Sequence, residues 1–231
     1  MQVNLVNESK NFSSSTLRSF VAPLQQFCNF VTTPWEIPKV TVISSSARIL
    51  DGVTFNVCVV DLFPDPTQQA KDYGYHEYLH NQPIAYIRAD SFGARNPAGD
   101  FLKQLSLFGK VIRQAEALAP GVFSVICHET AEGLLDPTCN TLKKDAQGRQ
   151  WVMEVCDHTV GKYLITANGV TVVAPDFTYP SFYNVAGHGP FSFMNVPTAP
   201  FTLPSGAYGY TEPKVGEIIP LTATSEALDH E

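Results

Sequence analysis

The sequence has few basic residues: 15 Lys and Arg stand against 22 Asp and Glu, which gives a net charge of −7. Nucleic-acid-binding proteins depend on Lys and Arg to neutralise phosphates, so we expect no nucleic-acid partner. Long apolar runs are missing as well, and none reaches the roughly 18 residues of a membrane span. The first residues, MQVNLVNESKNFSSS, lack the basic and apolar regions of a secretory signal peptide. We therefore expect synthesis in a cytoplasm, without a membrane span and without secretion through a signal peptide.

Motifs of several enzyme classes are also missing. The sequence has no glycine-rich phosphate loop and no G-x-S-x-G segment, which argues against nucleotide chemistry and a serine nucleophile. The five cysteines are odd in number and widely spaced, which argues against a disulfide framework. Small buried thiols are the plain interpretation. The alternative is a thiolate zinc site that combines Cys127, Cys139 and Cys156 with His128 or His158, although no C-x-x-C pair is present.

Apolar residues make up 44% of the chain, enough for the core of one α+β domain. Their spacing predicts helices over residues 17–31, 100–118 and 122–135, and strands over residues 39–44, 53–60 and 84–89. A hairpin is predicted over residues 162–175, because Asn168-Gly169 is a strong turn signal between two alternating runs. We take residues 1–183 as the domain. The Pro-, Gly- and aromatic-rich residues 184–231 predict an extended arm that packs on the domain or on a partner.

The helix predicted over residues 122–135 carries the segment HETAEGLLDP, in which His128, Glu129 and Glu132 interrupt an apolar run. Residues four apart share a helix face, so His128 and Glu132 point the same way. Zinc peptidases with an H-E-x-x-H helix use this spacing for two metal ligands, and the glutamate between them takes a proton from the attacking water. A salt-bridged helix face is the plain alternative. However, buried charges need partners, and no Lys or Arg lies within this helix.

A third ligand is available downstream, in the segment VMEVCDH. Glu154 follows Glu132 at a separation comparable to that in zinc peptidases whose third ligand is a glutamate. Asp157 or Asp136 would then accept a hydrogen bond from the ring of His128. One histidine and two carboxylates leave a divalent cation without net charge, which activates water less than a two-histidine site does. We therefore expect zinc, calcium or another divalent ion, or none, and weak or specialised activity.

The order HETAEGLLDP, MEVCD, hairpin and PDFTYPSFY resembles a family of zincin-like proteins encoded by tailed bacteriophages. The family pattern is His-Glu-x-x-Glu with Asp-Pro, then Glu-x-x-Asp, then Phe-x-x-Pro with an aromatic residue. The resemblance extends over residues 73–183, and the matching residues are His128, Glu129, Glu132, Asp136, Pro137, Glu154, Asp157, Phe177, Pro180 and Phe182. The family continues Glu-x-x-Asp with proline and an acid, whereas this chain has His158, so the role of His158 stays open.

The resemblance implies a phage origin, a virion location and a zincin-like fold with a mixed sheet, two long helices and a metal-site helix. Our first hypothesis is a metal-dependent peptidase. Its residues are Glu129 as general base, His128, Glu132 and Glu154 as ligands, and Asp136, Asp157 and His158 as supporting groups. An edge strand formed by Ile84, Ala85, Tyr86 and Ile87 would hold an extended peptide substrate by backbone pairing.

Two alternatives keep the fold and change the role. The chain is then either a catalytically inactive structural component of the head, neck or tail, bound to other virion proteins, or a free cytoplasmic metallopeptidase that acts on host proteins. A separate question concerns YHEYLH, where His76 and His80 are four residues apart. If this segment is helical, the two histidines predict a second metal site. The neighbouring tyrosines favour instead a partly exposed aromatic stretch beside a cleft or a partner.

Overall fold

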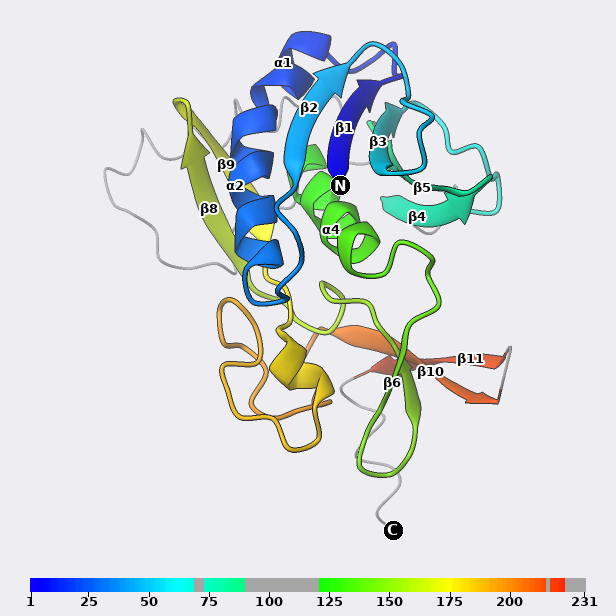
Figure 1. Ribbon diagram of the computed structural model, residues 1–231, viewed down its shortest axis with the longest axis vertical. Coiled ribbons are helices and arrows are strands. Elements are labelled where there is room, and N and C mark those ends of the chain that lie inside the picture. The colour runs from blue at the N-terminus through cyan, green and yellow to red at the C-terminus, as the bar shows by residue number, and fades with distance from the viewer. Residues whose placement is uncertain (69–72, 90–120, 215–216, 223–231) are drawn as a thin grey trace.

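A computed structural model describes residues 1–68, 73–89, 121–214 and 217–222. The helix predicted over residues 100–118 lies outside these ranges. The described chain is a mixed α+β structure, as expected, with an upper part built on one sheet and a lower part of short strands and coil (Figure 1). No helix in the described ranges has both the length and the apolar character needed to cross a membrane.

The upper part is built on a five-stranded sheet in the order β2-β1-β3-β5-β4. The strands are β1 (Gln2–Asn7), β2 (Thr41–Ser45), β3 (Thr54–Val60), β4 (Gly74–Leu79) and β5 (Gln82–Arg88). Four of them run parallel, and β4 runs antiparallel to β5 at the edge of the sheet. Every residue of β3 is buried, as expected of a central strand covered on both faces.

The strand at the edge of the sheet is β4, which corrects our prediction for residues 84–89. We expected residues 84–89 to be an edge strand because Pro83 precedes them, but β5 is paired on both sides, with β3 and with β4. Pro83 is tolerated because the β3 ladder begins one residue later, at Ile84, so its missing N–H interrupts no bond on that side. The backbone of Ile84, Ala85, Tyr86 and Ile87 is therefore committed within the sheet, and these residues do not hold a peptide substrate as we predicted.

Three helices cover one face of the sheet: α1 (Ser14–Ser19), α2 (Val21–Thr32) and α4 (Val122–Leu135) (Figure 1). The bounds of α4 confirm the prediction, whereas the single helix expected over residues 17–31 is two helices that meet at Phe20. Pro23 explains the break, because its nitrogen has no hydrogen to donate to the carbonyl of Ser19. Side chains from the helices and the inner face of the sheet form the main core.

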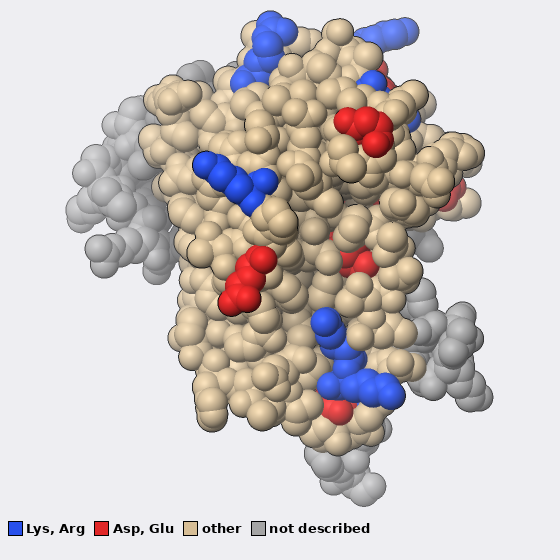
Figure 2. All heavy atoms as spheres, in the orientation of Figure 1, with Lys and Arg blue, Asp and Glu red and all other residues tan. Residues whose placement is uncertain are grey.

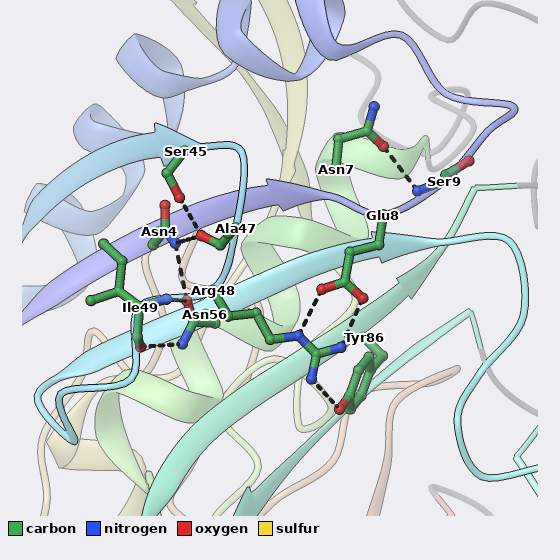
Figure 3. Close-up of polar contacts among 10 residues, drawn as sticks. All are labelled: Asn4, Asn7, Glu8, Ser9, Ser45, Ala47, Arg48, Ile49, Asn56 and Tyr86. Carbon is green, nitrogen blue, oxygen red and sulfur yellow. Dashed lines mark hydrogen bonds and ion pairs between the residues drawn. The ribbon is translucent and has the colours of Figure 1, made fainter.

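The opposite face of the sheet is closed by the loop between β2 and β3 (Figure 3). The side chain of Asn56 donates to the carbonyl of Ile49 and accepts from its N–H, both at 3.0 Å. Arg48 makes two 2.7 Å bonds to the carboxylate of Glu8 and donates to the hydroxyl of Tyr86 at 3.2 Å. These bonds fix the loop over this face of the sheet.

Two further sheets are small: one is a hairpin that packs beside α2 and α4 in the upper part, and the other lies in the lower part (Figure 1). The predicted hairpin is confirmed as β8 (Lys162–Ala167) and β9 (Val170–Pro175), with positive φ at both residues of the Asn168-Gly169 turn. The other sheet has the order β11-β10-β7-β6 and consists of β6 (Leu142–Lys144), β7 (Gln150–Val152), β10 (Tyr208–Lys214) and β11 (Glu217–Thr222). The two C-terminal strands were not predicted, so residues 208–222 are not the plain extended arm that we expected.

Candidate metal centre

The helix α4 places three ionisable side chains beside the edge strand β4. Glu129 and Glu132 are buried, and the side chain of His128 is 26% exposed. The helix lies close to the sheet because Gly133 has no side chain: a Cβ there would lie 2.3 Å from a ring carbon of Phe55. The helix thus brings two carboxylates and an imidazole into a largely apolar setting, where charges need partners.

The ring of His128 meets two carboxylates at one nitrogen. Nε2 lies 3.2 Å from Glu132 Oε2 and 3.0 Å from Asp157 Oδ1, and Asp157 Oδ1 has no hydrogen-bond partner among the described residues. Ligand atoms about 2.0–2.1 Å from a tetrahedral cation lie roughly 3.3 Å apart, so each separation fits two ligands of one ion. The ligand atoms around His128 that all lie within 4.8 Å of one another belong to Glu132 and Cys156, and not to Asp157. Asp157 faces the same nitrogen as Glu132, whereas a supporting carboxylate would meet the other ring nitrogen. The predicted contact between Asp157 and the ring of His128 is therefore present, but at the nitrogen that also faces Glu132.

Cys156 joins His128 and Glu132 in one group of ligand atoms, whereas the predicted ligand Glu154 does not. The Cys156 N–H donates to Glu132 Oε1 at 3.2 Å, and Cys156 Sγ lies within 4.8 Å of ligand atoms of His128 and Glu132. The predicted ligand Glu154 has a buried carboxylate oxygen, Oε2, that has no hydrogen-bond partner in the described chain. The donor set is thus able to hold a divalent cation, and its mixture of nitrogen, oxygen and sulfur atoms does not identify zinc in particular.

Two predicted supporting residues have other partners. Both carboxylate oxygens of Asp136 accept hydrogen bonds from Thr141, at 2.8 and 2.9 Å, so Asp136 holds the loop after α4 and not the ring of His128. His158 points away from the centre into an aromatic cluster, where Nδ1 lies 2.7 Å from the hydroxyl of Tyr183 and the ring stacks on Phe182. Burial lowers the pKa of His158 to about 4, so the ring is neutral and structural.

The sequence analysis did not place His76 at this centre. Its Nδ1 lies 3.1 Å from Glu129 Oε2 and 3.8 Å from Glu132 Oε2. The segment is the strand β4, not a helix, and the exposed His80 lies beyond its end in the turn, so the two histidines are not a helical pair. His80 and Asn81 form the hairpin turn, with φ of 51° and 64°. The turn residues that follow the short run of β4 were the signal that this segment is one arm of a hairpin.

The centre is short of positive charge. Burial opposes the charged form of His128, but attraction by Glu132 and Asp157 outweighs it and raises the pKa of His128 well above its ordinary value. Burial raises the pKa of Glu132, and burial together with repulsion by Glu132 raises that of Glu154 strongly. The raised pKa values mean that these side chains bind protons more readily than usual. A bound metal cation would supply the same positive charge in place of the protons.

The centre opens to a cleft of about 500 Å³. His128, Glu129 and Asp157 lie on its walls, and Tyr73 and Tyr208 stand at its sides with exposed rings. On the face seen in Figure 2, charged side chains are scattered singly among uncharged ones, without a broad basic patch. The cleft therefore combines an acidic, metal-competent floor with aromatic walls.

Comparison of the chain with protein-family models, with curated proteins and with solved structures found no match.

Proposed function

We propose that the chain is a zincin-like, metal-dependent peptidase of phage origin whose centre is formed by His128 and Glu132, with Asp157 and Cys156 beside them. The convergence of two buried carboxylates on one ring nitrogen, at the floor of a cleft, supports the proposal most directly. The mixed sheet beside a helix with the H-E-x-x-E pattern is also what the resemblance to zincin-like phage proteins implies.

A divalent cation held by these residues would polarise a substrate carbonyl and acidify a water molecule. Glu129 is the proton acceptor in this proposal, because its carboxylate lines the cleft one residue after His128. A peptide would lie along the outer side of β4, which is hydrogen-bonded to β5 on one side only within the described sheet. Backbone pairing of this kind holds an extended substrate with little dependence on its sequence.

The experiment combines metal analysis with a cleavage assay. The purified chain should contain a divalent cation, and it should cleave members of a peptide library until a chelator is added. Glu129→Gln should abolish cleavage and leave the cation at His128 in place, because the amide cannot accept the proton. Glu77→Gln is the matched control, since residue 77 lies on β4 one position after His76 and faces the opposite side of the sheet.

A chain that binds no divalent cation would refute the proposal and leave a structural role in the virion. Cleavage that survives in Glu129→Gln would remove the role of Glu129 alone. Virion membership is tested separately by mass spectrometry of purified particles.

A further inference from the structure

The ring of His76 is the feature that the proposed single-ion centre does not use. Its side chain is 7% exposed, and Nδ1 faces Glu129 and Glu132 from the strand opposite the helix. Its other nitrogen, Nε2, has no hydrogen-bond partner in the described chain, and neither has the buried Glu154 Oε2 nearby. With Nδ1 held this close to two buried carboxylates, a proton or a cation is needed between the nitrogen and those oxygens.

Ligand atoms at the centre fall into two groups. One contains His128, Glu132 and Cys156, the other contains His76, Glu129 and Glu132, and the atoms within each group lie within 4.8 Å of one another. Among the described residues, no such group contains both histidines. A single ion therefore does not reach both rings, whereas Glu132 belongs to both groups: its Oε2 lies 3.2 Å from His128 Nε2 and 3.8 Å from His76 Nδ1.

The charge of the centre points the same way. Four carboxylates gather here, those of Glu129, Glu132, Glu154 and Asp157, and one divalent cation offsets two of the four negative charges. Two divalent cations would balance all four carboxylates without requiring either imidazole to be charged.

We propose that the centre holds two divalent cations, the second bound by His76, Glu129 and Glu132, with Glu132 bridging the two positions. This inference rests on the proposed metal centre at His128 and adds a second position to it. It also gives Glu129 a second role. A carboxylate that ligates a cation is a weaker proton acceptor, so occupation of the second position would slow the hydrolysis proposed above.

The test counts cations on the full-length chain. The protein is stripped with a chelator and dialysed against buffered Zn²⁺, and the bound metal per chain is measured by elemental analysis. We expect two Zn²⁺ on the wild-type chain and one on His76→Gln, which removes the nitrogen that faces Glu129. His80→Gln should still bind two, because this exposed histidine four residues further on lies in the hairpin turn and is the matched control.

A second measurement does not depend on how the variants fold. Two Mn²⁺ ions bridged by one carboxylate couple magnetically, so the electron paramagnetic resonance spectrum of the wild-type chain should lose its isolated six-line pattern as the second equivalent binds. Loss of one Zn²⁺ in His76→Gln, together with this coupling, supports the proposal.

The other outcomes separate the two proposals. One cation on the wild-type chain would overturn the second position and leave the centre at His128 intact. Two uncoupled ions, or two on His76→Gln, would place the second ion elsewhere and overturn the inference as well. No bound cation would refute both.

Discussion

Gly74 sets the distance between the edge strand and the helix that carries the candidate centre. A Cβ added at this residue would lie 2.6 Å from Val125 Cγ1 and 3.1 Å from both Cγ and Oε1 of Glu129. Carbon atoms in contact are normally about 3.5–4.0 Å apart, so Gly74→Ala creates an overlap of roughly 1 Å with Val125. Overpacking of this size costs about 1–3 kcal/mol.

We expect Gly74→Ala to lower the free energy of unfolding of the metal-free chain by about 1–3 kcal/mol in urea. Val125→Ala removes the clashing methyl group. Adding Gly74→Ala to Val125→Ala should therefore lower the free energy of unfolding by much less than adding it to the wild-type chain. The Cβ would also crowd Glu129, so Gly74→Ala should weaken metal binding even where the fold is intact. Unfolding within 0.5 kcal/mol of wild type, or a loss that Val125→Ala does not reduce, would refute this account of the contact.

Three further predictions concern the centre and its surroundings. Since the folded pKa of His158 is about 4 and the unfolded value is about 6.5, the unfolded chain binds this proton first and stability should fall by about 3 kcal/mol as the pH drops from 6.5 to 4. Urea titrations of His158→Asn, which keeps a polar group for Tyr183, should lack this part of the pH dependence. Zn²⁺ at 100 times its dissociation constant should raise the free energy of unfolding by about 2.7 kcal/mol, measured by denaturant titration and reversed by chelator. Asp136→Ala should cost about 1–3 kcal/mol through its lost bonds to Thr141 and leave the number of bound cations unchanged.

Local patterns predicted the elements that depend on local physics. The bounds of α4 follow from an apolar run between Gly121 and Asp136, and the β8–β9 hairpin follows from Asn168-Gly169, whose positive φ values few other residue pairs accept. The i, i+4 spacing likewise placed His128 and Glu132 together, because helix geometry alone fixes that contact.

The errors concern contacts between segments far apart in the chain. His76 meets Glu129 across 53 residues, and no spacing rule encodes such a pairing. The edge position of β4 depends on sheet order, which the sequence of one strand does not specify. The conformation of the turn after β7 determines that Asp157, and not Glu154, faces His128. The sequence does not show in which direction two nearby acidic side chains point.

The antiparallel direction of β4 has a consequence for any chain that pairs with its outer side. A guest that pairs antiparallel to β4 would run in the same direction as β5, and a guest that pairs parallel to β4 would run the opposite way. Because alternate side chains of an extended guest point to opposite sides, a slip of one position would exchange every group that faces the cleft. Sequence specificity would then depend on every second residue of the guest, and Tyr73 and Tyr208 at the sides of the cleft would contact those residues.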